Sequence, residues 1–259
     1  MNASKKLELT AIPGIPLIRE GDDLAEIIYE ASKACELTFE DGDVLVLAQK
    51  IVSKSEGRLV NLNTVTPSER AEELAEYLDK RPELVELILS ESSEVLRTRP
   101  GTIIVQHKNG YVCANAGIDH SNVTGPWGEH ADWVLLLPEN SDESATRIRM
   151  GLEELSGAKV AVLIIDSHGR AWRNGVVGIS VGISGMPGLV DMRGSEDMNA
   201  YKLRVTTIAA ADELAAGASL LMGQANEGTP IVHVRGFPYP LREGSVAELI
   251  RDKEKDMFR

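Results

Sequence analysis

The stretch that most constrains the fold is Lys159–Gly175, with the sequence KVAVLIIDSHGRAWRNG. Six consecutive apolar residues, Val160 to Ile165, run directly into Asp166. An unbroken, β-rich apolar run of this kind is typical of a strand that is buried on both faces of a sheet. A carboxylate at the end of that strand would stand at a sheet edge, where α/β proteins commonly bind ligands. Gly169 permits a sharp turn just beyond it.

Two interpretations of this stretch are open from the residues alone. Asp166, Ser167 and Arg170 could form a platform for a metal-bound phosphate at one rim of the sheet. The alternative is a plain strand followed by an Asx turn, without a ligand. Short motifs of this kind often match by chance, so the rest of the chain has to decide between them.

Composition narrows the class of partner. The chain has 259 residues, a net charge of -13 and a pI near 4.9. So acidic a protein repels nucleic-acid backbones and anionic membranes, and we expect neither as a partner. The apolar runs are too short to span a bilayer, and the N-terminus MNASKKLELTAIPG has no apolar signal core, which predicts a soluble, cytoplasmic protein. Cys35 and Cys113 fit no disulfide or zinc pattern and are expected to be small core residues in a reducing compartment.

The pattern of strands and helices predicts the fold class. Strand signals are as frequent as helix signals, and Asn109-Gly110 joins the expected strands Thr102–His107 and Tyr111–Asn115 in a hairpin. We therefore predict a mixed α/β (α+β) fold with two interlocked subdomains and partly antiparallel sheets. The sequence shows no repeat and no linker, so residues 1–259 are expected to form a single unit in which the subdomain boundary cannot be placed.

The other elements follow from apolar periodicity and capping signals. The other expected strands are Leu7–Ile12, Val44–Ala48, Trp133–Leu137, Val176–Ile183, Tyr201–Thr206 and Ile231–Arg235. The expected helices start after Asp22 or Asp23, at the capping box Thr66–Glu69, at Pro82, at a Ser141 cap, over Ile208–Leu221 and, last, at Ser245–Glu248. In Val176–Ile183, glycines alternate with β-branched residues, which predicts that another element packs closely on this strand.

Several familiar sites are absent from the sequence. There is no Walker-type phosphate loop, no GxGxxG after a strand, no HExxH and no GxSxG, and the five histidines show no ligand spacing. What remains are Asp119 and Asp166, each after an apolar strand, Lys50 and Lys54 after another, and the glycine-bearing stretch Met222–Thr229. The lysines could simply be solvated, and the stretch could be a helix stop. Carboxylate and amide oxygens suit Mg²⁺ or Mn²⁺, so the sharper prediction is a metal-assisted site for a phosphorylated ligand.

Six blocks of sequence, taken in order, resemble those of a known protein family. They are GIPLIREGDDLAE, EDGDVLVLAQKIVSKSEGR, NAGIDHSN, VAVLIIDSHGRAWRNGVVG, ADELAAGASLLMG and VHVRG, and they cover nearly the whole chain. In these blocks the chain resembles the coenzyme F420-0 γ-glutamyl ligases, which complete the deazaflavin cofactor F420. The resemblance implies a GTP-dependent enzyme that needs two Mg²⁺ or Mn²⁺ ions, is helped by K⁺, and forms an intertwined homodimer. It would join L-glutamate to F420-0 and then add further glutamates through γ-linkages.

The resemblance also implies site residues. It places one metal ion on Asp119 and Asp166 and a second near Ser167 and Gln224, with Lys54 as a further catalytic group. The implied GTP contacts are Ile15, Pro16, Leu17, Ile18, Gln49, Lys50, Lys54, Asn122, Met222, Gly223, Gln224, Ala225, Asn226, Glu227, Gly228 and Thr229. Arg170 and Arg173 could hold the anionic substrate or the transferred phosphate, or could face solvent on a turn.

The implied mechanism proceeds through an acyl phosphate. GTP would phosphorylate the terminal carboxylate of F420-0, and the amine of glutamate would then attack and expel phosphate. Two other functions stay open: a metal-dependent phosphohydrolase, and a non-catalytic protein that binds a nucleotide or a deazaflavin. The presence of both Asp119 and Asp166 disfavours these alternatives.

Overall fold

A five-stranded sheet forms the centre of the computed structural model, which describes residues 5–126 and 128–257. Its strands lie in the order β1 (Glu8–Ala11), β12 (Ile231–Arg235), β2 (Val44–Ala48), β8 (Ala161–Arg170) and β9 (Arg173–Ser184). Only β2 and β8 are parallel, and the other neighbours are antiparallel. The predicted mixed α/β class is therefore confirmed. The start of the segment searched for a signal core, residues 1–4, lies outside the described residues.

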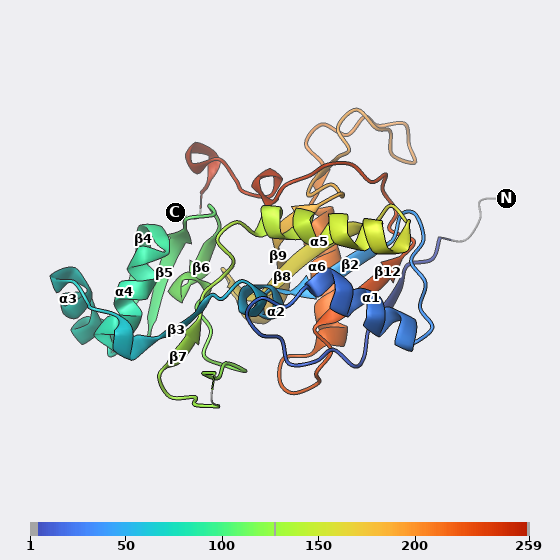
Figure 1. Ribbon diagram of the computed structural model, residues 1–259. Helices are drawn as coiled ribbons and strands as arrows, with labels where there is room; N and C mark the ends of the chain where they lie inside the picture. The colour runs from blue at the N-terminus through green and yellow to red at the C-terminus, as the bar shows by residue number, and fades with distance from the viewer. Residues whose placement is uncertain (1–4, 127, 258–259) are drawn as a thin grey trace.

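Helices cover both faces of this sheet. The helices α1 (Leu24–Ala34) and α5 (Ser141–Ser156) lie on one face, and α6 (Ala210–Met222) lies on the other (Figure 1). Successive residues of β8 alternate between the two cores, with Val162 and Ile164 toward α1 and α5 and with Leu163 and Ile165 toward α6. The predicted strand with both faces buried is thus confirmed.

A second, three-stranded sheet lies beside the first (Figure 1). It contains β4 (Ser92–Arg99), β5 (Thr102–His107) and β6 (Val112–Ala114), and α3 (Glu69–Leu78) and α4 (Pro82–Ser90) belong to the same part of the fold. Short segments connect the two parts: α2 (Gln49–Ser55), β3 (Leu59–Asn61), η2 (Asn115–Gly117) and β7 (Trp133–Leu135). The remaining short elements are η1 (Leu62–Thr64), β10 (Val190–Asp191), β11 (Thr207–Ile208), η3 (Val246–Glu248) and η4 (Lys253–Lys255). The division into interlocked subdomains stays a prediction.

The close packing expected on β9 is present. A Cβ added to Gly178 would lie 2.6 Å from the carbonyl oxygen of Ala215 in α6, and one added to Gly182 would lie 2.5 Å from that of Ser141 in α5. Neither position has room for a side chain. The alternating glycines therefore let helices approach the edge strand from both faces of the sheet.

Several expected element boundaries were wrong. The cap of α3 is Ser68 rather than Thr66, because the Ser68 hydroxyl accepts the Ala71 N–H at 3.3 Å. The cap of α5 is Asn140, so Ser141 is its first helical residue. The strand expected at Tyr201–Thr206 is absent: that stretch has only an isolated bridge from Lys202 to Glu196, and the two-residue β11 follows it.

Two smaller expectations also need correction. The last helix is only a 3₁₀ turn, capped by the Ser245 hydroxyl. Both cysteines are free, as expected, and Cys113 is buried, but Cys35 is exposed because it follows the last residue of α1. Within the described ranges, no helix is long and apolar enough to cross a membrane.

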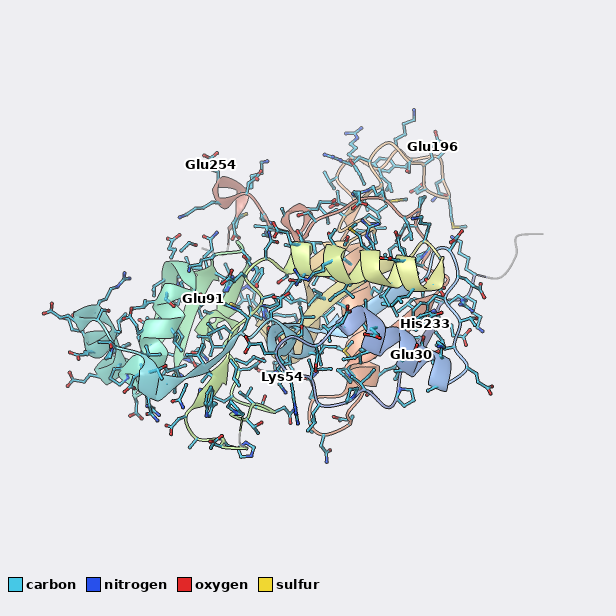
Figure 2. The ribbon with its side chains drawn as sticks, viewed as in Figure 1. Glu30, Lys54, Glu91, Glu196, His233 and Glu254 are labelled. Carbon is cyan, nitrogen blue, oxygen red and sulfur yellow. The ribbon has the colours of Figure 1, made fainter. Side chains whose placement is uncertain are left out.

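A buried ionic network lies at one end of the strands of the central sheet, where β2 begins and β12 ends. Asp43 precedes β2, and its carboxylate accepts hydrogen bonds from His233 Nε2 at 2.7 Å and from Arg235 Nε at 3.0 Å. Burial alone would raise the pKa of Asp43, but these two donors hold it far below its usual range. His233 lies well away from Lys54 in Figure 2, so this network is distant from the candidate site described next.

Candidate functional site

Several candidate segments meet at the opposite end of these strands, where β2 ends and β12 begins. The backbone N–H of Ile12 donates to Ile231, that of Ala48 donates to Pro230, and Ala48 pairs with Ile165. The C-terminal ends of β1 and β2 therefore lie beside the N-terminal end of β12. This arrangement brings the loop after β1, helix α2, residue Asp166 and the loop before β12 to one rim.

Asp166 lies within a strand rather than after it. Strand β8 continues to Arg170 because β9 pairs with it along its whole length. Strand β2 stops at Ala48, opposite Ile165, so Asp166 is the first residue of β8 beyond the end of β2. The expected turn at this point is wrong, yet the carboxylate still stands at the sheet edge.

Helix α2 holds the second carboxylate. Gln49 Nε2 and Lys50 Nζ both donate to Asp119 Oδ2, at 2.6 and 2.5 Å. The hydroxyl of Ser53 donates to Gln49 Oε1 at 2.9 Å, which turns the amide N–H₂ toward Asp119. The backbone of Asp119 is itself fixed by two hydrogen bonds with Leu135. Asp119 is therefore oriented on both its main-chain and side-chain sides.

The pKa shifts show that the two acids share one electrostatic environment. Burial raises the pKa of Asp119, Lys50 opposes this effect, and the negative charge of Asp166 raises the pKa further. Burial would also raise the pKa of Asp166, but a hydrogen bond from His168 Nε2 at 2.9 Å, together with Lys50, lowers it overall. Lys50 thus acts on both acids, and Asp166 acts on Asp119; we call Asp119 and Asp166 the carboxylate pair.

Three of the expected nucleotide-binding segments touch one another. Lys54 Nζ donates to the carbonyl oxygen of Asn122 at 2.9 Å, and Asn122 Nδ2 donates to that of Ala225, also at 2.9 Å. Burial and the charge of Lys50 lower the pKa of Lys54, whereas Asp119 raises it. Lys54 belongs to the last turn of α2 and is labelled in Figure 2. The amines of Lys50 and Lys54 and the loop after α6 thus surround one region next to the carboxylate pair.

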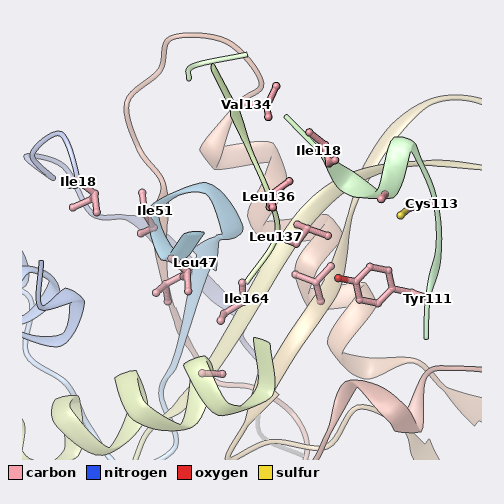
Figure 3. Packing of buried hydrophobic residues seen from close by; sticks show 14 of the residues in the cluster. Ile18, Leu47, Ile51, Tyr111, Cys113, Ile118, Val134, Leu136, Leu137 and Ile164 are labelled. Atoms are coloured by element: carbon pink, nitrogen blue, oxygen red, sulfur yellow. The ribbon is translucent and has the colours of Figure 1, made fainter. Parts of the chain in front are cut away.

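The proline-containing loop after β1 also reaches this region. Ile18 is buried and lies beside Ile51 of α2 (Figure 3). Leu17, by contrast, is 88% exposed, so the loop presents part of its length to solvent. The loop is thus anchored through Ile18 near α2, the helix that contains Lys54.

Other expected site residues lie apart from the carboxylate pair. Ser167 pairs with Gly178, so by strand alternation its side chain faces α6 and not the side of Asp166. Gln224 is exposed in the loop after α6. Arg170 and Arg173 are exposed at the tip of the β8–β9 hairpin, and Arg170 lies about 13 Å along the strand from Asp166 at ~3.3 Å per residue.

A cavity that does not include the carboxylate pair lies elsewhere in the molecule. It has a volume of about 540 Å³ and lies at the far end of α2, against the start of α5. Several of its charged side chains form ion pairs, for example Glu56 with Arg147 and Arg58 with Glu139. Asp119 and Asp166 do not line this cavity. The chemistry of the carboxylate pair makes that pair the better candidate site.

The carboxylate pair suits a divalent ion that is shared with a phosphate. The described ranges contain no group of three or more His, Cys, Asp or Glu side chains that could hold a metal. Mg²⁺ does not need such a cage, because it commonly takes one or two carboxylates and completes its shell with water and phosphate oxygens. Asp119 and Asp166 could provide those two carboxylates, and Lys50 and Lys54 could balance phosphate charge.

Two features of the site were missed at the sequence level. One is helix α2, which starts directly after β2 and has no side-chain cap. The other is the contact of His168 with Asp166. The i, i+2 spacing on a strand places both on one face and could have suggested this contact.

Comparison with known proteins gives a full-length match. Residues 14–236 match the family model described as F420-0:Gamma-glutamyl ligase. A relative from Methanococcus maripaludis, named coenzyme F420:L-glutamate ligase, is 44% identical over 98% of this chain and 98% of its own. Relatives of the same name from Archaeoglobus fulgidus and Methanothermobacter thermautotrophicus are 44% and 43% identical, over 98% of this chain and over 97% and 99% of their own.

Proposed function

Since this chain belongs to the F420-0:γ-glutamyl ligase family, we propose that it joins L-glutamate to coenzyme F420-0 at the expense of GTP and then adds further γ-linked glutamates. The observation that carries this proposal is the 44% identity to a ligase of that name over 98% of both chains. The carboxylate pair, flanked by Lys50 and Lys54 on one rim, supports a phosphoryl-transfer step.

The proposed reaction has two steps. The terminal carboxylate of F420-0 takes the γ-phosphoryl group of GTP, and the amine of glutamate then attacks the acyl phosphate and releases phosphate. Such chemistry depends on positioning and on neutralising charge rather than on a covalent enzyme group. In this reaction Lys54 and Lys50 would bind phosphate oxygens, while the hydrogen bond from Gln49 keeps Asp119 oriented.

Asp119 and Asp166 would hold Mg²⁺ or Mn²⁺. When bound, the ion would neutralise phosphate charge and align the transferred group. A second ion near Ser167 and Gln224, and a helping K⁺, belong to the same proposal. The support for the second ion is weaker, because Ser167 faces α6 and Gln224 is a neutral, exposed donor.

We also propose that the protein acts as a homodimer. The support is a set of exposed apolar side chains on the β8–β9 hairpin and at the end of α6. Trp172 is 88% exposed, Val176 55% and Leu220 85%. Exposed apolar surface of this kind is typical of protein–protein contacts.

The function is tested by incubating the protein with F420-0, GTP, Mn²⁺ and glutamate and measuring the products by mass spectrometry. A ligase increases the mass of the acceptor by glutamyl units and releases phosphate only when acceptor and glutamate are present. GTP cleavage without glutamate would indicate a phosphohydrolase. Binding without turnover would indicate a non-catalytic protein.

We expect GTP to be used in preference to ATP. This expectation follows from family membership, since the sequence contains no NKxD-like guanine-reading motif. The measurement is kcat/KM for each nucleotide at saturating F420-0 and glutamate. Equal values would show that the protein does not distinguish guanine from adenine.

Replacing Lys54 by alanine should raise the KM for GTP by about tenfold or more, since one charge-assisted hydrogen bond to a phosphate is worth ~1.5–3 kcal/mol. Lys5→Ala is the control, because Lys5 is exposed and lies before the first strand. Its KM should stay within about twofold of the parent protein. Similar KM values in the two variants would remove Lys54 from the phosphate site.

A further inference from the structure

A histidine lies directly against one member of the carboxylate pair. His168 is two residues beyond Asp166 on β8, so both side chains lie on the same face of the strand. The His168 Nε2 atom is 2.9 Å from Asp166 Oδ2, and the imidazole is 7% exposed. This contact is thus buried at the rim of the site rather than exposed at the surface.

The direction of this hydrogen bond follows from its partners. An ionised carboxylate only accepts hydrogen bonds, so the proton must be on His168 Nε2. The other ring nitrogen, Nδ1, has no hydrogen-bond partner among the described residues. Among the described residues, Asp166 is therefore the only polar partner of the imidazole, through Nε2.

Neighbouring aromatic rings hold the imidazole in place. The Tyr111 ring centroid is 6.0 Å from that of His168, and Tyr111 is stacked on His107 at 5.1 Å. Tyr111 is itself buried in the core cluster that includes Ile118 and Leu137 (Figure 3). The second sheet thereby limits rotation of the His168 side chain.

The two carboxylates are supported in the same way. Asp119 accepts a hydrogen bond from Gln49 Nε2, and Asp166 accepts one from His168 Nε2. Lys50 supplies the positive charge that both acids experience. Each carboxylate is therefore oriented by a donor of its own.

We propose that His168 is a positioning residue, which fixes the Asp166 carboxylate for the divalent ion through its Nε2 hydrogen bond. This inference rests on the proposed function. Donors behind ligating carboxylates commonly change metal affinity by about 10- to 100-fold when they are removed. We expect an effect of that size here.

The test measures Mn²⁺ affinity of the GDP-saturated protein by electron paramagnetic resonance. In His168→Gln, the amide nitrogen can occupy the place of Nε2, whereas His168→Asn is too short and His168→Phe has no donor. We expect His168→Phe and His168→Asn to bind Mn²⁺ about 10- to 100-fold more weakly and His168→Gln to stay within about threefold. The value of kcat at fixed Mn²⁺ should fall in parallel, with the KM for glutamate unchanged.

His107→Phe is the matched control. His107 is also buried and stacks on Tyr111, but among the described residues no side-chain hydrogen bond or ion pair joins it to Asp166. Its Mn²⁺ affinity should stay within about threefold of the parent protein even if its thermal midpoint falls. A comparable loss in His107→Phe would mean general loosening of the site and would overturn the proposal.

The remaining outcomes separate this inference from the proposed function. Unchanged affinity in both His168→Phe and His168→Asn, or a His168→Gln variant as weak as these two, would overturn the positioning role while the ligase assignment stands. If the parent protein binds no Mn²⁺ with GDP present, the proposed metal site fails, and this inference fails with it.

Discussion

Asp166→Asn should lose about 100- to 1,000-fold in kcat while the protein stays folded. The change preserves the shape of the side chain and removes the charge that a divalent ion requires, and losing one group that stabilises transferred charge has an effect of this size. Asp119→Asn should behave similarly, because Asp119 belongs to the same carboxylate pair. The measurement is initial ligase rate at saturating GTP, glutamate and Mn²⁺.

The double variant distinguishes a shared centre from two separate effects. Residues that act as one unit give non-additive losses, so Asp119→Asn combined with Asp166→Asn should lose little more than either alone. Asp132→Asn is the control, since that carboxylate pairs with Arg81 outside the pair and should change the rate by less than about twofold. Multiplicative losses in the double variant, or near-native turnover in Asp166→Asn, would contradict a shared centre.

Stability should respond differently in the two single variants. Repulsion between two acids would make either substitution stabilising. The structure predicts this only for Asp119, whose pKa is raised by burial and by Asp166. Although burial raises the pKa of Asp166, His168 and Lys50 lower it overall, so the fold favours its charged form. The thermal midpoint should therefore hold or rise in Asp119→Asn and fall modestly in Asp166→Asn.

Much of the fold could be predicted from the sequence because its signals are local. The strand at Val44–Ala48 is a pure apolar run, and α4 begins at a proline suited to a first helical position. Helix α2 has no such signal: it is seven residues long, has no side-chain cap and follows its strand without a turn. Strand β4 also lacks a clear signal. Most of its residues are polar or half-exposed, and the strand depends on pairing with β5.

The candidate site was predictable in part for a similar reason. Asp119 and Asp166 each follow apolar residues, which identifies them from the sequence. Their proximity depends on β2 and β8 being parallel neighbours and on Gln49 and Lys50 reaching across from α2. These are contacts between distant segments, and periodicity carries no information about them. The contact of His168 with Asp166 likewise depends on β8 continuing past Asp166.

The largest expected loss of stability is for a substitution in the Asp43 network, which lies at the other end of the strands from the carboxylate pair. Asp43→Asn should lower the free energy of unfolding at pH 7 by about 3–5 kcal/mol, as expected when one partner of a buried ionic network is removed. The Asp43 side chain is 2% exposed and bonds to His233 and Arg235. An amide cannot replace its charge, so the Arg235 guanidinium would lose its buried partner. Guanidinium chloride unfolding measures the difference.

The pH dependence gives this prediction a sign. Burial raises the pKa of Asp43, but the His233 and Arg235 bonds lower it overall, so the fold favours the ionised form. The contribution of Asp43 is therefore present above its unfolded pKa of about 3.9 and is lost as the pH falls toward the folded value. The gap between the parent protein and Asp43→Asn should be full at pH 7 and should shrink below about pH 4.

Glu40→Gln is the matched control for this network. Glu40 also pairs with Arg235, at 2.9 Å, but its side chain is 63% exposed, and exposed pairs contribute only about 0–1 kcal/mol. Because the network lies away from Lys54, Asp43→Asn should keep near-parental kcat per folded molecule at temperatures well below its midpoint. A small stability loss, equal to that of Glu40→Gln, would show that the Asp43 network contributes little to the fold. A loss of kcat in the folded variant would instead show that the two ends of the strands are coupled.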